Sequence, residues 1–532
     1  MEKSNPTTLL NTEEKEELKL ISPGEIRVRI APSPTGPLHI GTARTALFNY
    51  LFAKKYQGTF ILRIEDTDVK RSSREWEKEI IEGLKWLGIE WQEGPDCGGK
   101  YGPYRQSERK EIYKNYIKRL LEEKKIYYCF CSKEELEAHR NYLMSIGQPP
   151  RYSGKCRELS EREIQKNLAE KKPFVLRLKT FPKKIVFKDI IRGEIEYDSE
   201  GFGDIVVAKD LSTPLYNLAC VIDDFEMKIT HVIRGEDHIP NTPKQILIAE
   251  ALGIKPPKYL HLPLILGSDR SKLSKRHGAK SILEYRGEGY LPEAVVNFLA
   301  LLGWNPGTAR EIFSMNSLIQ EFSPQRVQKS PAVFNLQKLD WINGFYIRQK
   351  SPEKLTELCI PYFIKAGLIT PYFETEQYPP GYGGEFITQK FKIAQTGEEI
   401  SFSFLQKIVG LYQERLKKLS DLSQLTDFFF KKKLEYPKEL LKWKDMSEKE
   451  IKDSLDKLKK ILAKIKNANW RKENLEKILL KEAEKVGDRG KLLWPLRVAL
   501  SGKEASAGPF EIAEILGKEK TLERIKEARK KL

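Results

Sequence analysis

Two short segments, far apart in the sequence, carry side chains suited to phosphate chemistry. The first is Pro37-Leu38-His39-Ile40-Gly41, and the second is Lys272-Leu273-Ser274-Lys275-Arg276. An imidazole and free N–H groups at a helix N-terminus stabilise phosphate oxygens, and loop lysines neutralise a departing pyrophosphate. A turn histidine and a lysine-rich loop are each common, so the prediction depends on finding the two together.

A second group of residues is suited to binding an amino acid that has an acidic side chain. Such a ligand carries two carboxylates and one ammonium, so its pocket needs at least one guanidinium and one acid. Arg29, Glu65 and Arg234 supply these groups at or near the ends of predicted strands. The alternative is that the three residues form structural ion pairs at strand ends.

The elements that must position these side chains alternate between strand and helix. Residues 26–30 alternate apolar and charged side chains, residues 41–56 have apolar residues at helical spacing, and residues 59–65 read as a buried strand. Helical patterns follow at 75–87 and 107–125. A strand, a Pro/Gly loop and a helix form the opening of a nucleotide-binding α/β unit, because the helix N-terminus offers N–H groups to phosphate.

The pattern changes twice further along the chain. Short β-like pieces lie at 174–178, 185–187 and 205–207, which indicates an insertion within the α/β domain. After Leu283 the sequence is predominantly helical, and the stripe of apolar residues between Ile451 and Ile465 marks one amphipathic core-facing helix. We therefore predict a Rossmann-like α/β catalytic domain with a mixed α+β insertion, followed by all-α C-terminal domains.

Composition narrows the class of protein. Lysine and arginine exceed aspartate and glutamate by 93 to 75, and both signs are spread along the chain. This excess favours a polyanionic partner, although a positive surface would also serve solubility. No apolar stretch reaches the 18 or so residues that a membrane span requires, and residues 1–24 are too polar for a signal peptide, so we expect a cytoplasmic protein.

The paired phosphate-binding segments resemble the "HIGH" and "KMSKS" signatures of class I aminoacyl-tRNA synthetases. Leu273 replaces the signature's Met and Arg276 its last Ser, changes that keep the cations. The resemblance narrows to glutamyl-tRNA synthetases, and in that family's order the chain contains Arg29-Ile30-Ala31-Pro32-Ser33-Pro34-Thr35-Gly36, Arg63-Ile64-Glu65-Asp66-Thr67-Asp68, Gly102-Pro103-Tyr104-Arg105-Gln106-Ser107 and Thr230-His231-Val232-Ile233-Arg234-Gly235-Glu236-Asp237-His238.

The resemblance implies ATP-dependent activation of L-glutamate, with Mg²⁺, and transfer of the glutamyl group to tRNA(Glu), by an enzyme that is usually a monomer. Whether tRNA(Gln) is also charged stays open. The implied ATP-binding residues are His39, Gly41, Lys272, Ser274 and Lys275, of which His39, Lys272 and Lys275 would be catalytic. The implied glutamate-binding residues are Arg29, Ser33, Glu65, Tyr216 and Arg234. Cys220 stands where some relatives have a polar amide, and we assign it no contact.

The same resemblance implies a division into domains. Residues 1–24 would be an N-terminal extension, 25–98 with 211–282 the catalytic domain, 99–210 an inserted tRNA acceptor-binding domain, 283–345 a stem-contact region and 346–532 a helical anticodon-binding domain.

Three of the six cysteines, Cys129, Cys131 and Cys156, lie close together and resemble the zinc module of some glutamyl-tRNA synthetases. A tetrahedral zinc site needs a fourth ligand. Glu158 stands where such relatives have a His, and Tyr152 is another oxygen donor nearby. The alternative to a zinc site is that these cysteines are reduced, partly buried thiols without a metal.

Three other functions are compatible with parts of this pattern. A shorter relative that glutamylates a tRNA base lacks an anticodon domain, whereas this chain continues for more than 200 residues past the lysine segment. Glutaminyl-tRNA synthetases share the signatures but have a β-rich C-terminal half. A catalytically dead RNA-binding relative would have no need of His39, Lys275 and Glu65.

Overall fold

The computed structural model describes residues 24–68, 70–271, 273–274, 277, 280–372 and 390–532. The chain forms two compact units. The first contains the chain up to Arg286 and Pro292–Leu339, and the second contains Gly287–Leu291 and Asp340–Leu532. All but the last residue of the predicted N-terminal extension lie outside the described residues.

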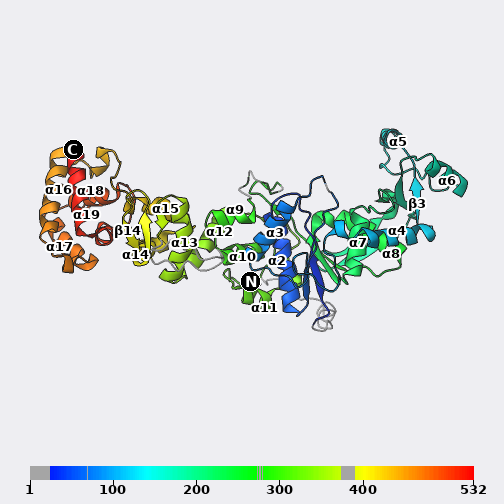
Figure 1. Cartoon of the computed structure of the whole chain (residues 1–532), viewed down its shortest axis with the longest axis horizontal. Helices are drawn as coiled ribbons and strands as arrows, with labels where there is room; N and C mark the ends of the chain where they lie inside the picture. The colour runs from blue at the N-terminus through cyan, green and yellow to red at the C-terminus, as the bar shows by residue number, and fades with distance from the viewer. Residues whose placement is uncertain (1–23, 69, 272, 275–276, 278–279, 373–389) are drawn as a thin grey trace, which may run out of the picture. The chain divides into compact units, whose positions relative to one another are not determined.

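The first unit is built on a largely parallel sheet (Figure 1). Strand β1 (Arg27–Ile30) pairs in parallel with β2 (Thr59–Leu62), and β8 (His231–Gly235) pairs in parallel with β9 (Lys258–Leu262). The two pairs are neighbours, since the Thr230 amide donates to the Arg27 carbonyl at 2.9 Å. Strand β9 also contacts β5 (Lys184–Asp189), which forms an antiparallel hairpin with β6 (Gly193–Asp198). The carboxyl ends of β1, β2 and β8 therefore meet at one edge, where open α/β sheets bind ligands.

Helix α2 is the main cover of this sheet. It is mainly apolar from Ala46 to Ala53, most of its residues are buried, and it packs on β1, β2 and β8. The helices of the first unit are α2 (Ile40–Lys55), α3 (Arg74–Trp86), α4 (Lys110–Glu122), α5 (Lys133–Ser145), α6 (Glu161–Ala169), α7 (Tyr216–Glu226), α8 (Thr242–Leu252), α9 (Ile282–Gly287), α10 (Pro292–Leu301) and α11 (Met315–Glu321). The short strands β10 (Ile265–Leu266) and β11 (Ala332–Val333) pair in parallel.

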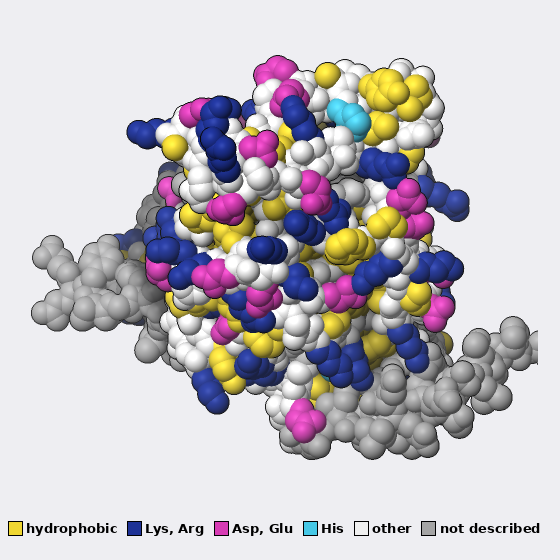
Figure 2. All heavy atoms as spheres, turned by 90° about the vertical axis from the view of Figure 1, so that its right-hand side faces the viewer, with side chains coloured by type: hydrophobic (Ala, Val, Ile, Leu, Met, Phe, Trp, Pro, Cys, Tyr) yellow, Lys and Arg dark blue, Asp and Glu magenta, His cyan; other side chains and the backbone are white. Residues whose placement is uncertain are grey.

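The predicted insertion carries a small sheet of its own. Strands β3 (Ile126–Cys129), β4 (Val175–Leu178) and β7 (Val206–Ala208) form it in antiparallel order, and α5 and α6 lie beside it (Figure 1). Both helices begin with a capping box, Ser132 with Glu135 and Ser160 with Glu163. On the face shown in Figure 2, lysine and arginine side chains are dispersed among aspartates and glutamates.

The second unit is mainly helical, as the apolar pattern predicts. Its helices are α13 (Pro352–Lys365), α14 (Phe402–Tyr412), α15 (Asp421–Thr426), α16 (Glu448–Ala463), α17 (Lys472–Glu484), α18 (Gly490–Ser501) and α19 (Pro509–Lys531), and α12 (Leu336–Arg348) begins in the first unit and ends in the second. The stripe from Ile451 to Leu462 is buried on α16. The sequence analysis did not anticipate a small antiparallel sheet of β12 (Ile369–Pro371), β13 (Lys390–Ile393) and β14 (Glu399–Ser401).

Two further findings concern membrane-spanning helices and cysteines. Across the part of the chain that is described, no helix is both long enough and apolar enough to cross a membrane. All six cysteines, each of which lies within the described residues, are free thiols, so no disulfide bond contributes to the fold.

Candidate active site

A cleft of about 680 Å³ opens at the carboxyl edge of the parallel strands. It is lined by eight of the predicted ATP- and glutamate-binding residues, namely Arg29, Ser33, His39, Gly41, Glu65, Tyr216, Arg234 and Ser274. Small-molecule sites commonly have volumes of roughly 300–1,000 Å³, so this cleft has room for a nucleotide and an amino acid. The predicted residues Lys272 and Lys275, and their neighbour Arg276, lie outside the described residues.

The His39 turn is fixed by its position as N-cap of α2. The Gly41 amide donates to Nδ1 of His39 at 3.1 Å, so the ring hydrogen resides on Nε2, which lies 3.0 Å from Thr42 Oγ1. A Cβ atom placed on Gly41 would lie 3.1 Å from Cε1 of the imidazole. Glycine at this position therefore allows the ring to sit against the helix terminus with a hydrogen-bond donor in the cleft.

Residues 281–282, which follow the lysine segment in the sequence, lie directly beside the His39 turn. The Ile282 amide donates to the Leu38 carbonyl at 2.8 Å, and Ser281 forms an antiparallel bridge with His39. Leu273 and Ser274 line the same cleft as His39. The fold thus brings the described residues of the two predicted phosphate-binding segments to one cleft, although the segments are far apart in the sequence.

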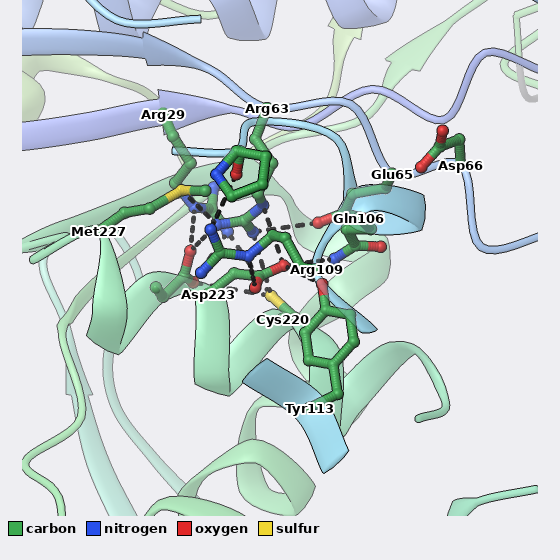
Figure 3. Close-up of polar contacts among 12 residues, drawn as sticks. Arg29, Arg63, Glu65, Asp66, Gln106, Arg109, Tyr113, Cys220, Asp223 and Met227 are labelled. Atoms are coloured by element: carbon green, nitrogen blue, oxygen red, sulfur yellow. Dashed lines mark hydrogen bonds and ion pairs between the residues drawn. The ribbon is translucent and has the colours of Figure 1, made fainter. Parts of the chain in front are cut away.

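Arg29 and Glu65 belong to a buried network of charges behind the cleft (Figure 3). Arg29 donates from Nε and Nη2 to the Asp224 carboxylate at 3.0 and 3.3 Å. Arg63, which is fully buried, links this carboxylate to Glu65, with distances of 2.7 Å to Asp224 Oδ1 and 3.0 Å to Glu65 Oε1. Arg29 and Glu65 therefore form structural ion pairs, as the alternative interpretation expects, and both also line the cleft, where the predicted ligand contacts stay predictions.

The pKa values of the two carboxyl groups are shifted in opposite directions. Burial raises the pKa of Asp224, but Arg29 and Arg63 outweigh burial and lower it to about 2. Burial raises the pKa of Glu65 above its usual value, and Arg63 and Arg29 offset only part of that effect. An incoming ammonium would stabilise the charged form of Glu65 further.

Asp223, the neighbour of Asp224 on α7, forms the second centre of the network. Arg109, Gln106 and Tyr113 converge on its carboxylate, at 2.7, 2.8 and 2.9 Å (Figure 3). Asp223 is fully buried, so this centre ties α7 to α4 and to the segment before it.

Arg63, Asp223 and Asp224 belong to the site although the sequence did not predict them as site residues. One signal was available, because Tyr216, Cys220 and Asp224 recur at steps of four and therefore share a face of α7. The Cys220 thiol lies between the charges, 3.8 Å from Arg63 Nη2 and 3.6 Å from Asp224 Oδ2. Burial raises the pKa of Cys220 to about 12, so it stays a neutral thiol.

Arg234 lies on the other side of the cleft, at the end of β8. Its Nε donates to His261 Nε2 at 3.2 Å, and its Nη2 donates to Thr242 Oγ1 at 2.7 Å. Its Nη1 is buried and has no hydrogen-bond partner among the described residues. Tyr216 reaches the same region, with its hydroxyl 3.1 Å from His238 Nδ1. Burial lowers the pKa of His238 to about 4, so this imidazole is neutral.

The cysteine cluster lies at the end of β3. The sulfurs of Cys129, Cys131 and Cys156 all lie within 4.8 Å of one another, and the last two are 3.5 Å apart. Ligand sulfurs of a tetrahedral zinc site lie roughly 3.8 Å apart, given Zn–S bonds of about 2.3 Å. Hydrogen bonding from Cys156 lowers the pKa of Cys129, and the same hydrogen bond raises the pKa of Cys156, so Cys129 is the first of the two thiols to ionise.

The two predicted candidates for the fourth ligand differ in position. The Tyr152 hydroxyl is 3.4 Å from the sulfurs of both Cys129 and Cys131. The Glu158 side chain is 85% exposed and pairs with Arg157 at 3.8 Å. Only Tyr152 is directed into the cluster.

Comparison with known proteins identifies the class to which this fold and cleft belong. A family model described as "tRNA synthetases class I (E and Q), catalytic domain" matches residues 25–341, and one described as "Anticodon binding domain" matches residues 354–529. The chain is a class I aminoacyl-tRNA synthetase.

Relatives and solved structures narrow this result. The chain is 48% identical to a glutamate–tRNA ligase 1 of Caldicellulosiruptor saccharolyticus, over 94% of this chain and 98% of the relative. It is 46% identical to a glutamate–tRNA ligase of Carboxydothermus hydrogenoformans, over 92% and 97%. A crystal structure of a glutamate tRNA ligase from Elizabethkingia meningosepticum, in complex with its amino acid, matches with TM-score 0.81 and 34% identity, over 95% of this chain and 99% of that one. The chain belongs to the glutamate–tRNA ligase family.

Proposed function

We propose that the chain activates L-glutamate with ATP to form glutamyl-adenylate and pyrophosphate, and then transfers the glutamyl group to the 3′ end of tRNA(Glu). The observation that carries this proposal is the buried Nη1 of Arg234, which lies in a cleft shared with Arg29, Glu65 and the His39 turn. A carboxylate ligand would give this donor a partner.

Each residue has a stated role in the proposal. Arg29 and Arg234 pair with the two carboxylates of glutamate, Tyr216 and Ser33 contribute hydrogen bonds, and Glu65 accepts the α-ammonium. His39 donates from Nε2 to a phosphate oxygen of ATP as negative charge moves onto the leaving pyrophosphate.

The remaining ATP contacts come from the lysine segment. Ser274, Lys272 and Lys275 would close over the phosphates, and Gly41 lets the backbone approach them. Mg²⁺ enters with the nucleotide, held chiefly by the phosphates.

Aminoacylation assays test the proposal directly. Glutamate and glutamine are each supplied with purified tRNA(Glu) and tRNA(Gln), and we expect glutamate to be joined to tRNA(Glu). Charging of tRNA(Gln) with glutamate would widen the substrate range, whereas charging with glutamine alone would contradict the proposal. The helical second unit supports glutamate as substrate, since glutaminyl-tRNA synthetases typically have a β-rich C-terminal half.

Pyrophosphate exchange tests a second property that the family implies. We expect exchange near background without tRNA, and equally fast exchange without it would contradict this expectation. We also propose that the enzyme acts as a cytoplasmic monomer, which sedimentation at several concentrations would check, and that residues 99–210 and 346–532 contact the acceptor end and the anticodon.

We further propose that Cys129, Cys131, Cys156 and Tyr152 hold a structural Zn²⁺. A closed site of three thiolates and one phenolate would lock β3 to residues 152–156, with no open position for chemistry. Metal content measured on the purified protein should be about one zinc per chain. Cys156→Ser should lose the metal and Tyr152→Phe should weaken its retention against a chelator, while Glu158→Gln should keep it. If Tyr152→Phe and Glu158→Gln lose zinc to the same extent, Tyr152 is not the fourth ligand.

A further inference from the structure

Arg234 differs in its surroundings from Arg29, the other guanidinium proposed to contact glutamate, which is paired with Asp224. It is 5% exposed, and among the described residues no carboxylate oxygen pairs with it. Its two bonded nitrogens contact an imidazole and a hydroxyl, both neutral acceptors. A buried cation without a counterion is costly, so an arrangement that keeps Arg234 unpaired points to a ligand carboxylate as its partner.

The imidazole that contacts Arg234 is held by a buried acid. His261, on β9, and Asp189, at the end of β5, are both inaccessible to solvent, and Nδ1 of His261 lies 2.7 Å from Asp189 Oδ2. A carboxylate accepts hydrogen bonds, so the ring hydrogen lies on Nδ1 and leaves Nε2 as a bare acceptor. That is the only neutral form of His261 that can accept from Arg234 Nε.

Asp189 is itself fixed by the backbone. Its Oδ1 accepts from the amides of Ile191 and Arg192 at 2.9 and 2.8 Å, and its Oδ2 also accepts from the His261 amide at 3.0 Å. Its position at the end of β5 places it beside Tyr259 of β9 in the sheet. The carboxylate therefore holds one ring orientation and one tautomer of His261.

The position of the acid explains why a histidine lies between it and the arginine. An aspartate in direct contact with Arg234 would neutralise the guanidinium and compete with a substrate carboxylate. Through the neutral imidazole, Asp189 fixes Nε of Arg234 while the positive charge stays available at Nη1.

We propose that Asp189 and His261 are positioning residues for glutamate, which orient Arg234 through the Nδ1–H tautomer of His261 without neutralising it. The inference rests on the proposed function, because it takes Arg234 as a contact of the glutamate carboxylate. It adds to that function Asp189 and His261, which do not touch the substrate. Asp189 lies within the predicted insertion, residues 99–210.

The test measures KM for glutamate, KM for ATP and kcat in aminoacylation of tRNA(Glu) by the full-length enzyme. Asp189→Asn should present an N–H group to Nδ1 of His261 and so favour the other tautomer, which places a second donor against Arg234. His261→Phe removes the acceptor altogether. Both variants should raise KM for glutamate by roughly 10- to 100-fold while KM for ATP changes far less.

Two further variants separate positioning from packing. His261→Gln places an amide oxygen where Nε2 lies and should recover most of the affinity for glutamate. Phe187→Leu alters a ring that packs against His261, with centroids 6.4 Å apart, and leaves the hydrogen bonds in place. It should leave KM for glutamate unchanged, and a rise equal to that of His261→Phe would show that the effect is packing alone.

Arg234→Ala distinguishes failure of the inference from failure of the proposed function. If this variant leaves KM for glutamate unchanged, the assignment of Arg234 to the substrate is wrong. If it raises KM for glutamate while Asp189→Asn and His261→Phe do not, or if those two raise both KM values equally, the positioning role alone is overturned.

Discussion

Charge balance is the main property of the residues behind the cleft. Three guanidiniums and three carboxylates lie within one buried network, namely Arg29, Arg63, Arg109, Glu65, Asp223 and Asp224. Removing one member of a buried pair leaves an uncompensated charge, which is much more costly than losing a surface pair. Arg234 lies outside this network, so the two guanidiniums that we propose as glutamate contacts differ: Arg29 is already paired with a carboxylate and Arg234 is not.

The His39 turn gives a prediction at the scale of single atoms. Gly41→Ala would place a methyl group 3.1 Å from the His39 ring and displace Nε2 from the cleft. We expect kcat/KM for ATP to fall at least tenfold, since loss of one positioned donor typically costs about 10²- to 10³-fold. Gly410→Ala, in α14, is a matched control because a Cβ atom there meets nothing within 4 Å. Equal activity in both variants would show that the His39 geometry is unimportant.

Helix α7 connects the substrate pocket to the rest of the first unit. Its Asp224 holds Arg29 and Arg63, and its Asp223 holds Arg109 together with two polar side chains of the α4 region. Two consecutive carboxylates of one helix thus position charges that come from β1, from the residue after β2 and from the N-terminus of α4.

Asp224→Asn tests the role of this helix. The substitution leaves Arg29 and Arg63 short of one negative charge, so the free energy of unfolding should fall by roughly 3–5 kcal/mol. KM for glutamate should rise as well, because Arg29 loses its anchor. Glu123→Gln is the control, since the Arg119–Glu123 pair is exposed and screened by solvent, so its loss should change stability very little. Chemical denaturation measures both variants, and similar losses of stability would contradict the role given to α7.

At the scale of the whole molecule, three buried histidines make the first unit sensitive to acid. Burial lowers the pKa values of His231, His238 and His261, to about 4 for the first two. In the unfolded chain these histidines take up protons near pH 6.5, whereas in the folded chain they do so only at lower pH. Their contribution to the free energy of unfolding is therefore fully present above pH 6.5 and is lost as the pH falls toward 4.

His231 gives the clearest case. It is 4% exposed, Lys258 adds to the lowering of its pKa, and protonation alone should cost up to about 3 kcal/mol of folding free energy below pH 4. Melting temperatures between pH 7.5 and 4 should therefore fall less steeply in His231→Phe than in the unaltered protein. The same substitution at His139, on α5, is the control, and parallel curves for all three proteins would show that His231 does not contribute.

The sequence by itself determined the family, the fold class and the elements that carry the site. These predictions are confirmed because they depend on local information: apolar periodicity, turn residues and motifs read within one segment. The predicted roles of Arg29, Glu65, Arg234 and the lysines stay predictions, although the fold places all those that are described in one cleft.

Only the tertiary structure decided which groups face one another. Asp224 reaches Arg29 across 195 positions of sequence, and Asp189 reaches His261 across 72. Tyr152 rather than Glu158 is directed at the cysteines because the chain turns back at Cys156, whose amide donates to the Tyr152 hydroxyl. Periodicity shows that a side chain is buried, but the partner of a buried charge depends on which strands become neighbours, and that is decided only when the sheet assembles.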